Sequence, residues 1–437
     1  MDSNDEEKAK GKTVEVGRAQ FDTTSKKYTI FDAPGHKNYV PNMIMGAACA
    51  DVAGLVISAR KGEFEAGFEA DGQSREHAQL AKSLGVQKLV VVINKMDDCR
   101  WSKERYDQIV KDLAPFLKAT GYKDEDITYL PISGLTSENI ATKVDPKVCN
   151  WYSGPTLLEV IDTVQLMPRY PAGPLRLPIL DKWKDKDLIA FGKVENGTLR
   201  LGDKLAIMPS GVPAQVLSLL DAKGQVVKYA TPGENVSVTL NVADEDQVQR
   251  GFVLCQRESM MPVTDVFEAE LDILDLLDYK PIISKGYHCM MHIHTHAGEV
   301  TISHIVKSFE TNDRGEVTEK QKPQFARSQT KIICRMSPTN PVSLEKFETI
   351  QQMGRFTLRD DGKTICVGKV LKYKPYNKSA SAAQGQVAAL AKKLDSTQIT
   401  SSSEPVKGEV VMNLETGEVK EKAKPLGAIA EGEEEAD

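Results

Sequence analysis

The sequence has no cysteines at the spacing of a metal site or a disulfide framework. Seven cysteines stand singly along the 437 residues, and no Cys-x-x-Cys occurs: Cys49, Cys99, Cys149, Cys255, Cys289, Cys334 and Cys366. This distribution argues against a structural zinc site and against a small secreted domain held by disulfides. We therefore expect a reducing compartment, and the predicted location is cytoplasmic.

The sequence also lacks long apolar runs and an excess of basic residues. No run approaches the roughly 18 apolar residues that a membrane-spanning helix needs. Residues 1–7 are acidic and polar, unlike the basic and apolar regions of a signal peptide. The formal net charge of −6 argues against broad nucleic-acid binding by the whole surface. We expect no membrane partner and no direct, sequence-specific nucleic-acid partner.

A third absence is the phosphate loop, Gly-x-x-x-x-Gly-Lys-Ser/Thr, whose backbone amides and lysine hold nucleotide phosphates at a helix N-terminus. Gly-Lys-Thr occurs twice, at 11–13 and at 362–364. The position five before the glycine is Glu6 in the first case and Thr357 in the second, where the loop requires glycine. Neither triplet is therefore a phosphate loop.

Two motifs are present, each at the end of an apolar run. One is Asn-Lys-Met-Asp at 94–97, and the other is Asp-Ala-Pro-Gly-His at 32–36. A carboxylate at the end of a buried parallel strand can accept hydrogen bonds from N1–H and the exocyclic amine of guanine, donors that adenine does not offer there. We predict that Asp97 reads guanine, that Asn94 braces the loop and that the stem of Lys95 covers the ring.

The order of the motifs extends this prediction to phosphate and magnesium. Asp32 is expected to hold a Mg²⁺-bound water, the Gly35 amide to face the terminal phosphate, and His36 to position the attacking water. Thr13 is a candidate hydroxyl ligand of Mg²⁺ on a switch loop. The alternatives are a common turn for Asp32, a structural histidine for His36 and an edge strand for Thr13. GTP or GDP with Mg²⁺ is the predicted ligand.

Two further groups of residues are candidates. Ser133, Gly134 and Leu135 follow the last predicted strand of this region, where their backbone amides would face the guanine oxygen, although Ser-Gly alone is a turn signal. Three alternating histidines would share one face of a strand, which suggests a metal site: His292, His294 and His296. A half-exposed strand without metal is favoured, because no cysteine or carboxylate lies at helpful spacing.

Apolar runs alternate with helical patterns up to about residue 165, which is typical of a doubly wound parallel sheet. The expected strands are 13–21, 27–31, 54–58, 89–93 and 128–132. The expected helices are 38–48, 74–84, 103–120 and 156–164. The segment 61–72 holds three glycines and four acidic residues and is expected to be a mobile loop.

Beyond Pro168, short apolar runs separated by glycines predict two all-β barrels. The predicted fold is an α/β domain of the P-loop type at 1–168, without its first strand and phosphate loop, and barrels at 175–260 and 265–376. The composition of 377–437 predicts a disordered acidic tail.

Residues 2–375 resemble the translational GTPases of the elongation-factor type, and within them the eukaryotic release-factor GTPases. The matching segments are DAPGHK at 32–37, PNMI at 41–44, ISARKGEFE at 57–65 and GRFTLRD at 354–360. The resemblance implies GTP hydrolysis coupled to translation termination, with the stop-codon-reading release factor and the ribosome as partners. The related ribosome-rescue GTPases are the near alternative, and delivery of aminoacyl-tRNA is disfavoured by GRFTLRD.

The resemblance also implies that the release factor docks at Gly354, Arg355, Phe356, Thr357, Leu358, Arg359 and Asp360. Arginine and phenylalanine are residue types that anchor interfaces. The alternative is a buried strand with Phe356 and Leu358 in the core. Both descriptions can hold, because alternate residues of a strand face opposite ways.

In this family the strand that leads into the phosphate loop would lie between the strands at 27–31 and 54–58. Without it two edges are unpaired, and each dry unpaired backbone group costs roughly 1 to 3 kcal/mol. We therefore expect a gap or collapse at this place and hypothesise an N-terminally incomplete copy of a full factor. The alternative function is a non-catalytic module that binds the release factor.

Overall fold

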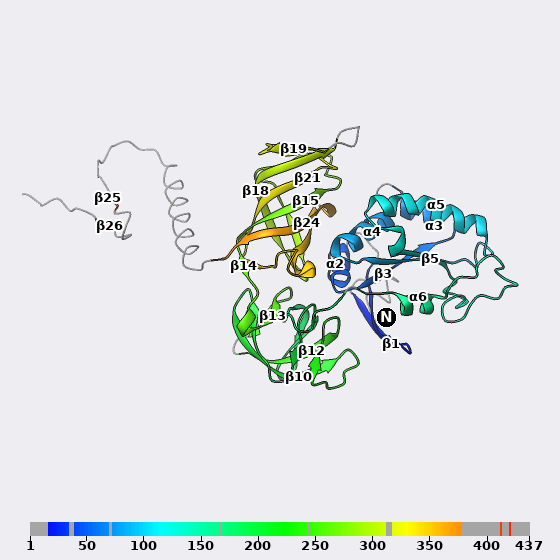
Figure 1. Cartoon of the computed structure of the whole chain (residues 1–437), viewed down its shortest axis with the longest axis horizontal. Coiled ribbons are helices and arrows are strands. Elements are labelled where there is room, and N and C mark those ends of the chain that lie inside the picture. The colour runs from blue at the N-terminus through cyan, green and yellow to red at the C-terminus, as the bar shows by residue number, and fades with distance from the viewer. Residues whose placement is uncertain are drawn as a thin grey trace, which may run out of the picture. The chain divides into compact units, whose positions relative to one another are not determined.

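The structure is a computed structural model that describes residues 16–34, 39–69, 72–166, 168–242, 245–311 and 317–376, with 411–412 and 419–420. Residues 1–376 form one compact unit and residues 377–437 a second (Figure 1). In the second unit β25 (Val411–Met412) and β26 (Val419–Lys420) pair antiparallel, and the rest of the predicted tail lies outside the described residues. Within the described ranges, no helix is both long and apolar enough for a membrane span.

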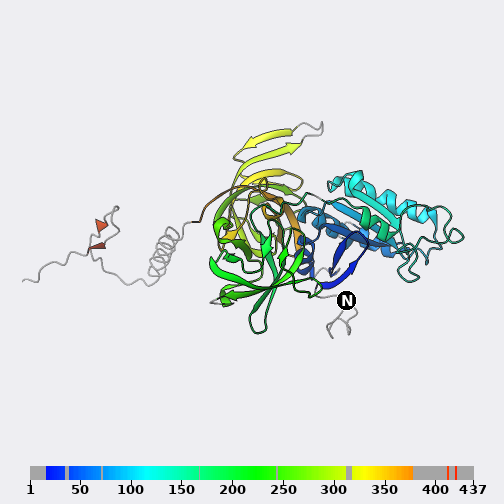
Figure 2. The same ribbon diagram turned by 60° about the horizontal axis from the view of Figure 1, so that its bottom comes forward.

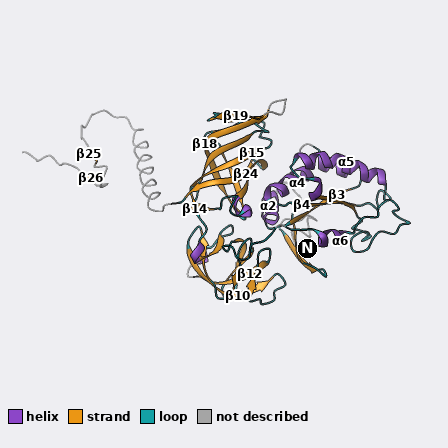
Figure 3. Cartoon of the chain, viewed as in Figure 1, coloured by secondary structure: helices purple, strands orange, loops and turns teal. Residues whose placement is uncertain are grey.

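The N-terminal α/β part contains a parallel sheet in the order β3 (Val52–Ser58), β4 (Lys88–Asn94) and β5 (Ile127–Pro131). Five consecutive residues of β4 are buried, as expected for a strand covered on both faces. One face packs on α5 (Lys103–Ala119), and the other packs on α6 (Leu157–Thr163). Figure 3 shows that the long helices lie in this N-terminal part, whereas the two parts that follow it consist mostly of strands.

The remaining helices of this part are α2 (Val40–Ala48), α3 (Glu63–Phe68), α4 (Gln73–Leu84) and the short η2 (Asp124–Asp126). Local signals explain the helix ends. The Ser102 hydroxyl accepts a hydrogen bond from the Arg105 amide at the start of α5, and Thr156 forms a reciprocal capping box with Glu159 at the start of α6.

The predicted gap in the sheet is confirmed for the described residues. Strands β1 (Gly17–Asp22) and β2 (Lys27–Asp32) form an antiparallel hairpin in a sheet of their own, and neither pairs with β3. The turn of this hairpin is held by Asp162, which accepts hydrogen bonds from Thr23 (2.6 Å), Ser25 (2.9 Å) and Tyr28 (3.0 Å). One edge of β3 thus has no partner strand among the described residues, and Val56 of this strand is 62% exposed.

The predicted mobile loop at 61–72 is wrong, because α3 lies inside it. Gly62 adopts a φ of 86° and its amide donates to the Glu65 carboxylate at 2.7 Å, so a glycine and an acid that indicated a loop start a helix. Phe64 is buried and stacks on Phe68 with ring centroids 5.4 Å apart. Arg105 on α5 secures the segment through Glu65 at 2.8 Å.

The prediction of two all-β barrels is confirmed. The first is closed in the order β10, β12, β7, β6, β13 and β9. Its strands are β6 (Leu177–Lys184), β7 (Leu188–Lys193), β9 (Lys204–Met208), β10 (Val212–Asp221), β12 (Asn235–Val242) and β13 (Val253–Gln256). Short elements beside it are β8 (Leu199–Arg200), β11 (Tyr229–Ala230), η3 (Glu245–Gln247) and η4 (Arg257–Ser259).

The second barrel closes because β17 pairs with both β23 and β18. Its strands are β15 (Val266–Ile273), β17 (His288–Ile293), β18 (His296–Thr311), β21 (Lys331–Pro338), β23 (Arg355–Asp360) and β24 (Lys363–Lys374). Strand β19 (Val317–Gln321) pairs with the end of β18, and this hairpin projects beyond the barrel in Figures 1 and 2. The short elements are β14 (Val263–Thr264), β16 (Ile283–Ser284), β20 (Phe325–Ala326), β22 (Val342–Ser343) and α7 (Gln351–Gly354).

The three histidines do not share one face of a strand, so that expectation is wrong. The chain reverses between β17 and β18, with His294 and Thr295 in the turn and a φ of 41° at His294. His294 is buried, and its Nε2 lies 3.1 Å from the backbone oxygen of Ser343. Among the described residues, no group of three or more histidine, cysteine or acidic side chains could hold a metal ion.

Candidate functional site

The candidate site lies where β4 and β5 end side by side. The Asn94 Oδ1 accepts hydrogen bonds from the backbone amides of Lys95 at 2.7 Å and Gly134 at 2.8 Å. The structure thus brings the segment 94–97 together with 133–135, and Asn94 makes the contact that its bracing role requires. Gly134 leaves room for this contact, since a Cβ there would lie 3.3 Å from the Asn94 amide group.

The other residues of these two segments differ in exposure. Ser133 is buried, and its Oγ accepts from the Thr136 amide at 3.2 Å. Met96 is buried under the loop, whereas Leu135 is 86% exposed. The Leu135 side chain therefore does not line the interior of the site.

Asp97 carries an unsatisfied acceptor. Its Oδ1 is buried and has no hydrogen-bond partner among the described residues. A buried polar atom without a partner costs free energy, so a ligand that brings donors to this carboxylate is favoured. The two adjacent N–H groups on the guanine edge fit such an acceptor, and the base end of the predicted site therefore agrees with the residues present.

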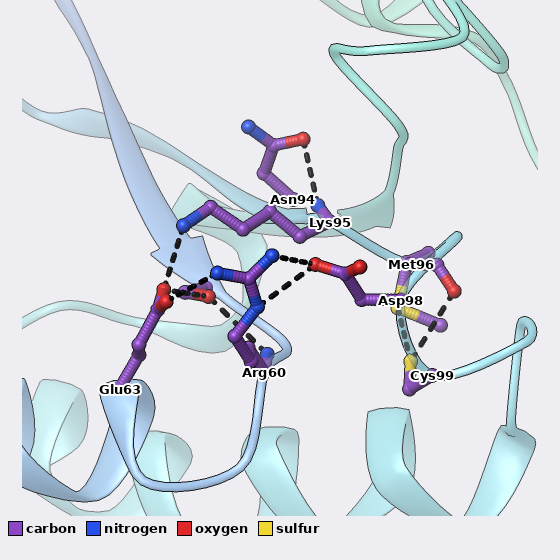
Figure 4. A network of polar contacts seen from close by, with 8 residues as sticks. Arg60, Glu63, Asn94, Lys95, Met96, Asp98 and Cys99 are labelled. Carbon is purple, nitrogen blue, oxygen red and sulfur yellow. Dashed lines mark hydrogen bonds and ion pairs between the residues drawn. The ribbon is translucent and has the colours of Figure 1, made fainter.

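A chain of alternating charges lies beside this loop (Figure 4). Lys95 Nζ is 2.6 Å from Glu63 Oε2, and Arg60 Nη1 is 2.8 Å from Glu63 Oε1. Arg60 also donates through Nε to Asp98 at 2.9 Å. Hydrogen bonds from Lys95 and Ser58 lower the pKa of Glu63 to about 2, so the carboxylate is ionised throughout the neutral range.

Sequence reasoning missed Arg60 and Glu63 as members of the site. Both follow β3, the strand next to β4, and the carboxyl ends of adjacent parallel strands share one edge of the sheet. This adjacency was the available signal. For Glu63 this signal is hidden, because the segment 61–72 is interpreted as a mobile loop.

The phosphate end is only partly described. Asp32 ends β2, which belongs to the separate hairpin, and Thr13, Gly35 and His36 lie outside the described residues. The triplet at 362–364 lies at the turn from β23 to β24, where Gly362 has a φ of 77°, so it is not a phosphate loop. The part of the chain that the structure describes therefore does not assemble a Mg²⁺ site.

The predicted docking segment 354–360 is a buried strand. Phe356, Thr357 and Leu358 have at most 1% of their surface exposed, and both apolar residues belong to the core of the second barrel. Arg355 and Asp360 at the two ends of the strand are only partly buried, and direct contact of this segment with a partner stays a prediction.

The two arginines of this segment face the N-terminal part of the same chain. Arg359 Nη1 donates to Glu76 of α4 at 3.0 Å. The Arg355 guanidinium lies against the end of α4, where a Cβ on Gly85 would be 2.5 Å from its Nη1. Both arginines thus make contacts within the chain, and their role as interface anchors stays a prediction.

Three family models match consecutive parts of the chain. The elongation factor Tu GTP binding domain matches residues 1–167, elongation factor Tu domain 2 matches 187–255, and the GTP-eEF1A C-terminal domain-like family matches 266–371. The three matches follow the order of the α/β part and the two barrels.

Curated relatives are similar over most of the chain. The eukaryotic peptide chain release factor GTP-binding subunit of Zygosaccharomyces rouxii is 45% identical over 377 residues, which are 85% of this chain and 56% of the relative. The subunit of the same name from Kluyveromyces lactis is 44% identical over 375 residues, 85% of this chain and 53% of the relative. The chain thus spans about half the length of these relatives.

Solved structures share the fold. The S. cerevisiae Ski7 GTPase-like domain bound to GTP superposes with a TM-score of 0.66 at 17% identity. The match covers 84% of this chain and 85% of that domain. At this identity the likeness concerns the arrangement of one α/β domain and two barrels.

Proposed function

We propose that this chain, which belongs to the family of eukaryotic peptide chain release factor GTP-binding subunits, binds guanine nucleotide and acts in translation termination. In this role it assists the stop-codon-reading release factor on the ribosome, in the cytoplasm. The observation that carries the proposal is the buried, unpartnered Asp97 Oδ1 beside the Asn94–Gly134 contact.

One group of residues is proposed to bind the guanine base, and another is proposed to bind the phosphates and Mg²⁺. Asp97 accepts from the guanine edge, Asn94 fixes the loop, and the backbone of 133–135 faces the guanine oxygen. When GTP and Mg²⁺ are bound, they supply the phosphoanhydride that is hydrolysed and the charge that offsets its phosphates. Asp32 and Thr13 are proposed for Mg²⁺.

For the hydrolysis itself, two residues of the 32–36 motif are proposed. The Gly35 amide holds the terminal phosphate by hydrogen bonding, and His36 orients the attacking water. Both roles rest on the motif and on family membership.

A second candidate is a non-catalytic module that binds the release factor. One observation favours it: Glu6 and Thr357 stand where the two Gly-Lys-Thr triplets would need glycine to form a phosphate loop. Most phosphate contacts come from that loop, so a chain without it loses affinity and catalysis together. Hydrolysis of radiolabelled GTP in the presence of ribosomes and release factor separates the two candidates.

Replacing Asp97 tests the base assignment. A carboxylate accepts two hydrogen bonds from guanine, whereas an amide matches xanthine, which carries an oxygen in place of the exocyclic amine. We expect Asp97→Asn to weaken binding of fluorescent GDP about tenfold to a hundredfold, since a bidentate contact to a base edge contributes roughly 1 to 3 kcal/mol. The variant should gain affinity for xanthosine diphosphate.

The control is Asp107→Asn, which removes an exposed carboxylate from α5, where it pairs with Lys103. Its nucleotide affinity should equal that of the unmodified chain. Equal GDP binding by Asp97→Asn and the unmodified chain would contradict the base assignment. A pull-down that recovers rescue-pathway ribosomes without the release factor would favour the ribosome-rescue alternative.

A further inference from the structure

We infer that Glu63 is a positioning residue for the guanine ring, because it holds Lys95 so that the lysine stem forms one wall of the base site. This inference rests on the proposed function and adds a residue that neither the motif nor the family match assigns. Glu63 acts through Lys95 and does not itself touch the base.

The geometry begins with the lysine. Lys95 follows β4 with a left-handed φ of 64°, and its amide is held by Asn94 Oδ1 at 2.7 Å. Its side chain extends from this fixed backbone to Glu63 Oε2, 2.6 Å from Nζ, as Figure 4 shows. Both ends of the four-carbon stem are therefore fixed before any ligand binds.

The carboxylate that holds the lysine is itself held. Glu63 Oε2 also accepts from the Ser58 hydroxyl at 2.8 Å, and Oε1 accepts from Arg60 at 2.8 Å. Arg60 is fixed in turn by Asp98, which lies next to Asp97 in the base-reading loop. The network thus joins the end of β3 to the loop after β4.

A buried arginine, Arg105, holds the turn between β3 and α3 that carries this network. Arg105 on α5 donates through Nε to the backbone oxygen of Ala59 at 2.8 Å and through Nη1 to Glu65 at 2.8 Å. These contacts hold the turn between β3 and α3, from which Glu63 projects. The position of Glu63 is therefore set by the fold and does not depend on the ligand.

The purpose of this arrangement is preorganisation. A lysine side chain has many rotamers, and ordering it on ligand binding reduces affinity. Glu63 removes that cost by ordering the stem in the free protein. The Lys95 and Glu63 side chains are 41% and 39% exposed, and such exposed pairs contribute little to folding stability. The pair should therefore matter for ligand affinity and hardly for unfolding.

The test is Glu63→Gln in the full chain, with fluorescent GDP and inosine diphosphate as probes. Glutamine keeps the size of the side chain and an acceptor for Ser58, but loses the charge that holds Lys95. We expect the Kd of both nucleotides to rise by the same factor, about threefold to tenfold, the range for one immobilised flexible side chain. An equal factor is expected because a stem that covers the ring does not touch the exocyclic amine.

Three accompanying measurements keep the result specific. Asp107→Asn breaks a similarly short and exposed ion pair, 2.6 Å from Lys103, and should leave both Kd values unchanged. The midpoint of thermal unfolding should be the same in both variants and the unmodified chain. The ratio of Kd values between Glu63→Gln and the unmodified chain should stay constant from pH 8 to pH 5, because the pKa of Glu63 is about 2.

Several results would overturn the inference. An unchanged Kd in Glu63→Gln, a loss confined to GDP, or an equal loss in Asp107→Asn would each contradict a positioning role of Glu63. In those cases the proposed function stands, because the unmodified chain still binds guanine nucleotide. If the unmodified chain binds neither nucleotide, the proposed function and this inference fail together.

Discussion

At the scale of single residues, buried histidines make the stability of the fold depend on pH. The Nδ1 of His294 is buried and has no hydrogen-bond partner in the described structure. Its Nε2 donates to the backbone oxygen of Ser343, which fixes the neutral tautomer with a bare Nδ1. Burial lowers the pKa of His294 to about 3 and that of His292 to about 4, with smaller contributions from His296 and Arg359.

Acidification should therefore destabilise the second barrel. The unfolded chain takes up protons at these histidines below about pH 6.5 while the folded chain does not, so stability falls as the pH drops from 6.5 toward 4. At pH 5.5 each histidine lowers the free energy of unfolding by about 1.4 kcal/mol relative to neutral pH. Urea unfolding at pH 7.5 and 5.5 measures this difference. The variant His294→Gln keeps a donor for the backbone oxygen of Ser343. In this variant the change in the free energy of unfolding between pH 7.5 and pH 5.5 should be smaller by about 1.4 kcal/mol, the contribution of one histidine.

At the scale of elements, the sequence predicts the bounds of a strand or helix well where its hydrophobic pattern extends over the whole element. The runs at 89–93 and 128–132 and the helical pattern at 103–120 correspond to β4, β5 and α5 within about one residue at each end. The failures occurred where one residue type supports two conformations. Glycine and acidic residues mark both loops and helix starts, which concealed α3, and alternating histidines concealed a hairpin turn.

The alternative of a buried strand at 354–360 is confirmed by β23, and docking of a partner at this segment stays a prediction. Alternation shows which residues lie on one side of a strand, and it does not say what covers that side. Arg359 meets Glu76 across more than half of the chain length, a contact that no local pattern contains.

Packing between β23 and β24 offers a test at the element scale. Gly368 pairs with Phe356, and a Cβ at Gly368 would lie 2.2 Å from the phenylalanine ring. We expect Gly368→Ala to destabilise the second barrel by roughly 1 to 3 kcal/mol, because the ring must leave its rotamer. The matched control is Gly54→Ala in β3, where nothing lies within 4 Å of the added carbon. Equal urea midpoints for both variants would refute this packing argument.

At the scale of the whole molecule, buried or half-buried ion pairs join parts that are distant in sequence. Arg176, just before β6, contacts Glu345 of the second barrel at 2.6 Å, with both side chains less than 10% exposed. Lys193 at the end of β7 contacts Asp51 before β3 at 2.9 Å. Burial opposes the charge of Lys193, but Glu195 and Asp51 outweigh it and raise its pKa. Sequence reasoning placed the three parts and gave no account of these contacts.

The pair between the two barrels gives the whole-molecule prediction. Glu345→Gln leaves the Arg176 guanidinium buried without a counter-charge, and breaking a buried pair in this way costs roughly 3 to 5 kcal/mol. We expect the unfolding transition of the barrels to shift to lower urea by that amount. Glu310→Gln breaks an exposed pair with Lys320 at 2.6 Å and should shift the transition hardly at all. Comparable shifts in the two variants would show that Arg176 is solvated.

The one-sided pairing of β3 has a practical consequence. Among the described strands, β3 pairs with β4 alone, and its Val56 is largely exposed. A bare strand edge is a template for a strand of another molecule, so self-association should grow with protein concentration. The purified chain at micromolar and at nanomolar concentration would then be two different species. A nucleotide affinity measured for this chain would therefore be valid only at the protein concentration used in the measurement.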